Sequence, residues 1–209
     1  ELLAVMLLVN GWNYLLEKKY KKMAALYIIA ISIHVTALCF VFASAIYWLK
    51  DHKYFFRIAP IIIGIVGRAY RVLIYYAAIF FPIYHNYYGN WKTVQNADVG
   101  LAKIIWLIIA FIAIYGIYFR RYDKIESIYA IFSLTYVMTN FVGMYFNYFE
   151  RIGTYFQPFS VLLFWMFKYK LRSKAIRNVY SCGVIISFTI YFLISGLTSA
   201  QYQYVTFLH

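Results

Sequence analysis

A carboxylate and a guanidinium stand next to each other between two long apolar runs. Glu150 and Arg151 lie in the segment FNYFERIGTYFQP, where Gly153 and Pro158 loosen the backbone. The guanidinium of Arg151 could hold an anionic leaving group. Glu150 could act as a general base toward a hydroxyl, although a neighbouring permanent cation weakens a carboxylate as a base unless it is desolvated. The alternative is an interfacial ion pair, which contributes about 0–1 kcal/mol and no chemistry.

Hydroxyl and amide side chains surround this pair in the sequence. They suit a saccharide, whose hydroxyl groups need hydrogen-bond partners and whose faces stack on aromatic rings. A belt of aromatic residues at a membrane interface explains the tyrosines equally well. The ring-rich segment 84–91, which contains Tyr88, has the same two interpretations. The residues around the pair are Tyr145, Asn147, Tyr148, Tyr155 and Gln157.

Two further guanidinium groups lie inside an apolar segment. Arg68 and Arg71 are three residues apart, and therefore on one helical face, within the run 58–82. A charge that faced lipid there would cost several kcal/mol, so both side chains should face protein, water or an anion. Their forked donors match a phosphate or pyrophosphate group. The alternative is that both side chains reach out to the membrane interface.

His34 is a lone imidazole in the apolar run AISIHVTAL. The ordinary explanation is a buried histidine bonded to a backbone carbonyl or to a Thr hydroxyl. No His, Asp or Glu lies three or four residues from it, so the local sequence predicts no metal site. The chain also has no P-loop, GxGxxG, HExxH or aspartate-rich motif, which argues against hydrolases, ATPases and metal-dependent nucleotide-sugar transferases. We therefore expect no metal and no cofactor.

Composition shows which elements must position these groups. Hydrophobic residues make up 65% of the chain and charged residues 13%, which a water-soluble fold of 209 residues could not accommodate. The formal charge of +13 comes from short Lys and Arg clusters between apolar runs. This pattern indicates positive-inside topology rather than nucleic-acid binding. Cys39 and Cys182 lie within apolar stretches and predict neither a disulfide nor a zinc site.

The later half of the chain contains four candidate membrane spans, at 99–119, 127–149, 152–167 and 178–198. The positive-inside rule places the basic clusters at 120–124 and 168–177 on the cytoplasmic side. The loop 83–98 and the Glu150–Arg151 junction must then lie on the external side. The polar groups of interest are therefore expected at the external face.

The earlier half is harder to interpret, because lysine clusters at 18–22 and 50–57 both flank the apolar stretch Met23–Leu49. This stretch favours a re-entrant pair of half-helices broken near Ser32 and His34, and a single tilted span is the alternative. We expect an all-α, polytopic transmembrane bundle of about six or seven membrane segments. Residues 1–209 are expected to form one membrane domain, the C-terminal part of a longer protein, because the chain starts at Glu1 within an apolar run.

Two stretches of the sequence resemble a known family. The opening segment has an apolar helix, a basic turn and a second helix that contains His34, Thr36, Ala37 and Leu38. Later, FERIGTYFQPFSVLLF is similar to the Asn-Arg-aliphatic-x-x-Tyr-Phe stretch of the EpsG/Wzy-like polysaccharide polymerases, with Arg151 after the position of the Asn. Glu150 replaces the expected Asn, and the tail QYQYVTFLH lacks the expected Pro-Tyr ending.

This resemblance implies a GT-C-like fold and a metal-independent glycosyltransferase in the bacterial inner membrane. Such a polymerase moves a growing glycan from undecaprenyl pyrophosphate onto a lipid-linked repeat unit at the external face. Catalytic roles are then expected for Arg151, Glu150 and His34. Substrate-binding roles are expected for Arg68, Arg71, Tyr155, Asn147, Gln157 and Tyr88. Membrane lipids, and not nucleic acid, are the other expected partners, and a chain-length regulator protein could be a further one.

Two other classes of function remain open on the sequence. A flippase or transporter of lipid-linked oligosaccharides could use the same Arg-rich cavity without chemistry. It should show repeat symmetry, and the sequence contains no repeat of 20 to 50 residues. A non-catalytic membrane subunit could use Arg68, Arg71 and Arg151 to contact partner helices or lipid headgroups, and separate rather than convergent arginines would support it.

Overall fold

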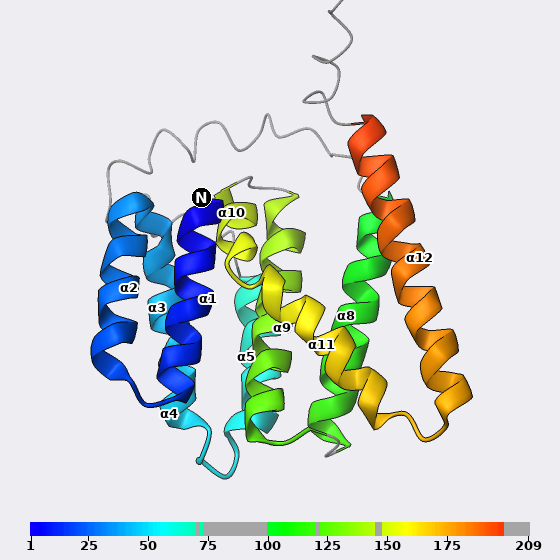
Figure 1. Ribbon diagram of the computed structural model, residues 1–209, viewed down its shortest axis with the longest axis horizontal. Coiled ribbons are helices and arrows are strands. Elements are labelled where there is room, and N and C mark those ends of the chain that lie inside the picture. Colours follow the sequence, from blue (N-terminus) through cyan, green and yellow to red (C-terminus); the bar gives the residue numbers. More distant parts are fainter. Residues whose placement is uncertain (70–71, 73–99, 120–121, 145–147, 199–209) are drawn as a thin grey trace, which may run out of the picture.

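The computed structural model describes residues 1–69, 72, 100–119, 122–144 and 148–198, and over these ranges every regular element is a helix (Figure 1). This confirms the predicted all-α class for the described residues. The helices are α1 (Leu2–Leu16), α2 (Tyr20–Ile33), η1 (Val35–Ala37), α3 (Leu38–Ser44), α4 (Ile46–Leu49), α5 (Phe55–Arg68), α8 (Gly100–Tyr118), α9 (Lys124–Gly143), α10 (Tyr148–Thr154), α11 (Gln157–Lys170) and α12 (Lys174–Thr198).

The stretch Met23–Leu49 forms two antiparallel pieces. Helix α2 runs up to His34, and η1, α3 and α4 return to the end from which α2 started (Figure 1). His34 ends α2 because its backbone is extended, with φ −151° and ψ 110°. The structure therefore breaks this stretch at His34, as the hypothesis of paired half-helices predicts, and a single tilted helix is wrong.

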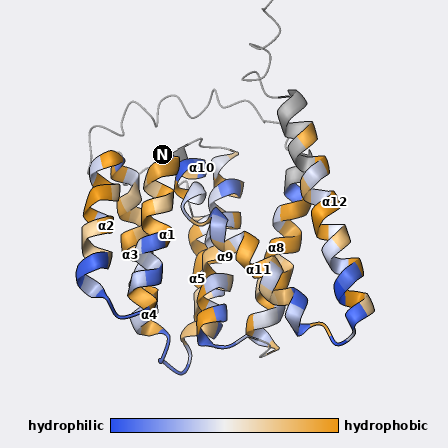
Figure 2. Cartoon of the chain, in the orientation of Figure 1, coloured by the Kyte–Doolittle hydropathy of each residue, from blue (hydrophilic) through white to orange (hydrophobic). Residues whose placement is uncertain are grey.

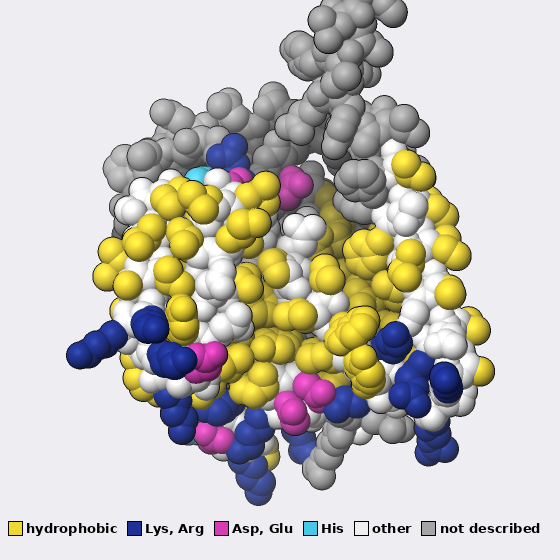
Figure 3. Space-filling model, in the orientation of Figure 1, with side chains coloured by type: hydrophobic (Ala, Val, Ile, Leu, Met, Phe, Trp, Pro, Cys, Tyr) yellow, Lys and Arg dark blue, Asp and Glu magenta, His cyan; other side chains and the backbone are white. Residues whose placement is uncertain are grey.

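The turns that carry most of the basic residues lie at one end of the molecule, called here the basic end. The turns between α1 and α2, α4 and α5, α8 and α9, and α11 and α12 all lie there (Figure 1). Figure 3 shows Lys and Arg side chains gathered at this end, with a broad apolar surface beyond them. The start of α1, the α2–η1 junction and α10 lie at the opposite end. The sequence prediction that the basic clusters share one side agrees with this arrangement.

Of the described helices, α9 alone has the length and the apolar composition that a membrane crossing needs. The stretches Leu2–Leu16, Val35–Leu49 and Lys103–Tyr118 are apolar but shorter. The predicted span 152–167 is wrong, because the chain changes helix at Tyr155 and Phe156, and Pro158 lies in the first turn of α11. Helix α9 covers much of the predicted span 127–149 but ends at Gly143.

Most of the helical residues are hydrophobic, and many of the hydrophilic residues lie at the turns of the basic end (Figure 2). Phe111, Val179 and Ile185 expose 67%, 73% and 65% of their surface. A contiguous apolar surface of this kind marks contact with lipid or with another protein.

Aromatic rings from four helices form the core around α9. Trp12 is 1% exposed, and its ring lies edge-on to Phe132 with centroids 5.1 Å apart. Phe40 and Phe159 stack within the same cluster, with centroids 5.6 Å apart. Because α5, α8, α10 and α11 also pack directly on α9, this helix is the element against which the others are positioned.

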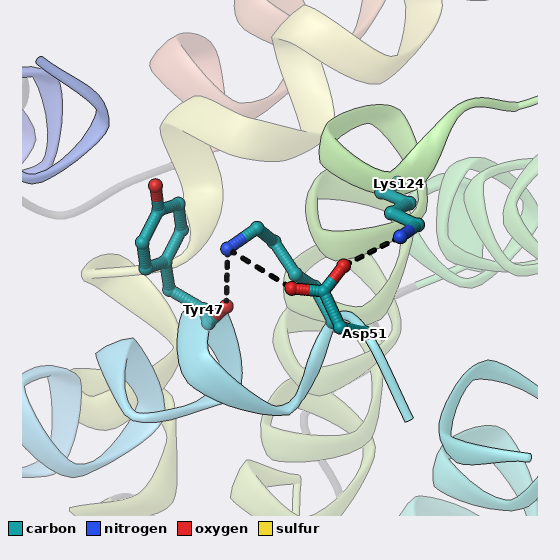
Figure 4. Close-up of polar contacts among 4 residues, drawn as sticks. Tyr47, Asp51 and Lys124 are labelled. Atoms are coloured by element: carbon teal, nitrogen blue, oxygen red, sulfur yellow. Dashed lines mark hydrogen bonds and ion pairs between the residues drawn. The ribbon is translucent and has the colours of Figure 1, made fainter. Parts of the chain in front are cut away.

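Ionic contacts fix the start of α9 at the basic end. Asp123 and Glu126 form a capping box, in which each side chain accepts a hydrogen bond from the other residue's backbone N–H. Lys124 pairs with Asp51 in the turn after α4, and Lys50 both approaches Asp51 and donates to the carbonyl oxygen of Tyr47 (Figure 4). These contacts tie the turn between α4 and α5 to α9.

Candidate functional site

His34, Thr36 and Tyr155 form a triangle of mutual polar contacts at the end opposite the basic turns. The Nδ1 atom of His34 lies 2.6 Å from Thr36 Oγ1 and 3.0 Å from the hydroxyl oxygen of Tyr155. The two hydroxyl oxygens are 2.8 Å apart. Thr36 and Tyr155, which are 119 positions apart in the sequence, therefore both contact Nδ1 of one imidazole. Such contacts fix the orientation of a histidine ring.

Two breaks between helices create this triangle. At the first, extended His34 ends α2, and η1 places Thr36 directly after it. At the second, α10 ends at Thr154 and α11 starts at Gln157, so Tyr155 lies in the corner between them, where it is 0% exposed. Backbone bonds from Tyr155 to Ile152 and from Phe156 to Gly153 make this corner a tight turn. His34 is half-buried, so the triangle lies at the edge of the core.

Glycines let α10 approach the end of α9 closely. A Cβ atom at Gly153 would lie 2.7 Å from Thr139 Oγ1 and 3.0 Å from Asn140 Nδ2, and one at Gly143 would lie 3.1 Å from Glu150 Cβ. Thr139 and Asn140 are buried, and each donates a hydrogen bond to a carbonyl of its own helix. The backbone of α10 therefore rests against a polar patch of α9, with no room for larger side chains.

Glu150 and Arg151 lie on α10, and both are exposed. Arg151 precedes Tyr155 by four residues, which places it about one helical turn before the triangle. Both members of the predicted pair are thus accessible from the end of the molecule where His34 lies. A cation and a carboxylate therefore lie on the helix that leads to Tyr155, which contacts the imidazole of His34.

Arg68 lies at the end of α5 that is farther from the basic turns. It is the last residue of α5 and is exposed. A Cβ atom on its neighbour Gly67 would lie 2.7 Å from Met138 Cγ, so this turn of α5 packs on α9 next to the turn that supports α10. Gln157, the first residue of α11, is also exposed. Arg71, Asn147 and Tyr88 lie outside the described residues.

The structure thus joins His34 and Tyr155, both predicted as site residues, and adds residues that the site prediction did not contain. Thr36 entered the sequence argument only as part of a family resemblance, and its place two residues after His34 is the signal that could have identified it. Thr139 and Asn140 gave a weaker signal, as polar residues near the end of an otherwise apolar run. The functional roles of all these residues stay predictions.

Of the comparisons with known proteins, one gives a match, and it is to a protein family. No curated protein and no solved structure matches the chain. The model of the EpsG family matches residues 1–208, which include the segments around His34 and Arg151 that carried the resemblance. The match extends over both helix breaks that form the triangle. The chain therefore belongs to the EpsG family.

Proposed function

We propose that this chain is part of a membrane polysaccharide polymerase. It transfers a growing glycan from undecaprenyl pyrophosphate to a lipid-linked repeat unit, without a metal ion. Membership of the EpsG family links the chain to exopolysaccharide biosynthesis. The observation that carries the proposal is the oriented imidazole of His34 at the end of the molecule that also carries Arg151 and Arg68.

The proposed orientation follows from the basic end. Positively charged turns remain on the cytoplasmic side of a bacterial membrane, so in this proposal the opposite end of the molecule, with α10 and the α2–η1 junction, faces outward. His34 and Arg151 lie on these segments, and Arg68 lies at the end of α5 that is farther from the basic turns. The apolar outer faces of the helices then contact lipid, and the α2–α3 pair, broken at His34, enters from the cytoplasmic side and returns. A lipid-linked substrate would approach laterally from the outer leaflet. Such a chain spans the cytoplasmic membrane several times.

In the proposed reaction, a hydroxyl oxygen of the acceptor sugar attacks the anomeric carbon of the donor glycan. The bond from that carbon to the diphosphate oxygen breaks, and the diphosphate leaves with the electron pair. Arg151 and Arg68 stabilise the negative charge that develops on it, because a guanidinium matches phosphate oxygens through two hydrogen bonds. Arg71 has the same chemistry and is proposed as a third cation.

His34 accepts the acceptor's proton in this scheme. If Nδ1–H donates to Thr36 Oγ1, the lone pair of Nε2 is directed away from the triangle toward substrate. Because a protonated Nδ1 cannot accept a hydrogen bond, the Tyr155 hydroxyl then supports the ring through Thr36. It does not touch the reacting atoms, which makes it a positioning residue instead of the substrate contact that the sequence predicted. Glu150 is the alternative base, and its exposure suits it equally to orienting the acceptor hydroxyl. Gln157, Asn147 and Tyr88 are proposed sugar contacts.

The decisive experiment measures glycan chain length in cells that carry the full-length protein with Arg151→Ala, Arg68→Ala or His34→Gln. Arg172→Ala is the matched control, because Arg172 is an exposed arginine at the basic end. Loss of one charge-stabilising donor in an active site typically lowers a rate about 10²–10³-fold. We expect shortened polymer and single lipid-linked repeat units on the external face in the three site variants, at membrane levels equal to those of the control.

Two other outcomes would contradict the proposal. Repeat units that accumulate on the cytoplasmic face would indicate a flippase. Polymer of normal length in all three site variants would contradict a mechanism based on these arginines and on His34. It would favour a non-catalytic subunit. Co-purification with a chain-length regulator protein would test the remaining proposed partner.

A further inference from the structure

A cavity extends from the turn that follows α4 along α5. It has a volume of about 530 Å³ and lies between the turn that follows α4, one face of α5 and the first half of α9. Its walls include Ile58, Ile62 and Ile63 of α5 and Ile131 of α9. His52 and Lys53 line it at the turn. The proposed glycosyl transfer uses none of these residues.

The cavity follows α5 lengthwise. Its α5 residues recur at Phe55, Ile58 and Ile62, so they form one stripe on the helix, roughly 10 Å long at 1.5 Å per residue. Ile58 and Ile62 are 48% and 52% exposed, so the described part of the chain leaves about half of this stripe uncovered. The single polar residue on the α9 wall, Thr135, already donates its hydroxyl hydrogen to the carbonyl of Ile131. The interior of the cavity therefore offers apolar contact.

The mouth of the cavity differs in charge from its interior. Lys50 and Lys124 both lie against Asp51. Within the described part of the chain, Lys53 is paired with no carboxylate, and its Nζ lies 5.3 Å from the centre of the Tyr54 ring. Lys53 and His52 are both exposed, and both line the cavity at this turn. Among the described residues, a lysine with no carboxylate partner thus lies at the border of an apolar groove.

We infer that this groove binds an anionic phospholipid of the leaflet at the basic end. The phosphate contacts Lys53 and His52, and one acyl chain lies along Ile58 and Ile62. Charge complementarity supports a lipid, since the cytoplasmic leaflet is rich in anionic headgroups that attract lysines next to the membrane.

The test uses full-length protein that is exposed to mixed micelles of detergent with phosphatidylglycerol or phosphatidylcholine and is then purified in mild detergent. Native mass spectrometry counts the lipid molecules that the protein retains. Lys53→Ala removes the charge, and Lys21→Ala is its control, an exposed lysine at the same end but in α2. Ile62→Trp fills the groove, and Ile61→Trp is its control, because Ile61 is 56% exposed on α5 and does not line the cavity.

We expect the unmodified protein and both controls to retain phosphatidylglycerol in preference to phosphatidylcholine. Lys53→Ala should reduce this preference at least fivefold, and Ile62→Trp should reduce retention of both lipids. Equal retention of the two lipids by the unmodified protein, or unchanged retention in Lys53→Ala, would overturn the inference. A change of oligomeric state in Ile62→Trp with lipid retention intact would show that a protein partner occupies the groove. These outcomes are independent of polymer length and so of the proposed reaction.

Discussion

At the scale of single residues, the hydroxyl group of Tyr155 joins two helix breaks through His34 and Thr36. Tyr155→Phe keeps the buried ring and removes only this hydroxyl. We expect a loss of about 0.5–1.5 kcal/mol in stability, the usual net value of a hydrogen bond in a protein. We also expect the maximal rate of polymerisation to fall on the order of tenfold without a change in the apparent affinity for the lipid-linked repeat, because base catalysis depends on the orientation of the imidazole.

A reconstituted assay with purified full-length protein would measure both kinetic parameters, and thermal unfolding would measure stability. Tyr118→Phe is the matched control, since the Tyr118 hydroxyl donates to the carbonyl of Arg57 over 2.8 Å near the basic end. This control should lose comparable stability and keep its rate. Equal rates in the two variants would show that Tyr155 has a structural role alone.

The sequence identified His34 and Tyr155 but could not predict their contact. A period or a motif shows which face of a helix a residue occupies, whereas the approach of residues 121 positions apart depends on how helices pack. The sequence did not predict the break between α10 and α11 at Tyr155, because apolar residues continue across it. Only Pro158 indicates that a new helix begins there. Thr36 was not predicted as part of the site, because the sequence does not distinguish it from any other polar residue in an apolar run.

At the scale of elements, the contact between α9 and α10 determines where Arg151 and Tyr155 lie. Gly153→Ala would place a methyl group 2.7 Å from Thr139 Oγ1 and 3.0 Å from Asn140 Nδ2. Thr139 cannot turn away at low cost, because its hydroxyl bonds the carbonyl of Thr135 over 2.9 Å. We expect Gly153→Ala to destabilise the protein by about 1–3 kcal/mol and to shorten the polymer, since α10 must move away from α9.

Gly64→Ala provides the comparison for this variant. Gly64 lies inside α5, and a Cβ atom added to it would meet nothing within 4 Å, so Ala should stabilise the helix by about 0.5–1 kcal/mol. Thermal unfolding in detergent should therefore shift in opposite directions for the two variants. A stabilising effect of Gly153→Ala would show that the two helices are not in tight contact.

The sequence predicted helices better than it predicted their ends. Long apolar runs gave the position of α8 to within about one residue, because burial and lipid contact both require continuous apolar faces, whereas the predicted span 127–149 extends beyond the end of α9 at Gly143. The turn after α1 was visible only as a lysine cluster. There Lys18 has a positive φ of 59°, and the N–H groups of Lys18 and Lys19 bond to Leu15 and Tyr14 in a Schellman arrangement. Glycine usually takes this position, so its usual sequence signal is missing.

At the scale of the whole molecule, the pairing of Asp51 with Lys124 links the α4–α5 turn to the central helix, and with it the wall of the proposed lipid groove (Figure 4). The hydrogen bond from Lys124 lowers the pKa of the Asp51 carboxyl below its ordinary value near 4. A lowered folded-state pKa means that this contribution to stability is fully present above about pH 4 and is lost as the pH falls through the folded-state pKa.

Thermal unfolding of the unmodified protein and of Asp51→Asn in detergent, from pH 7 to pH 3, tests this link. We expect a constant difference in melting temperature between pH 7 and about pH 5, and a difference that shrinks below about pH 4 as the Asp51 carboxyl becomes protonated. High salt should also reduce the difference, because both side chains are more than 60% exposed and the pair is screened. A difference that grows as the pH falls would mean that Asp51 stabilises the fold through a neutral hydrogen bond, and Lys124→Ala should then leave the effect of Asp51→Asn unchanged.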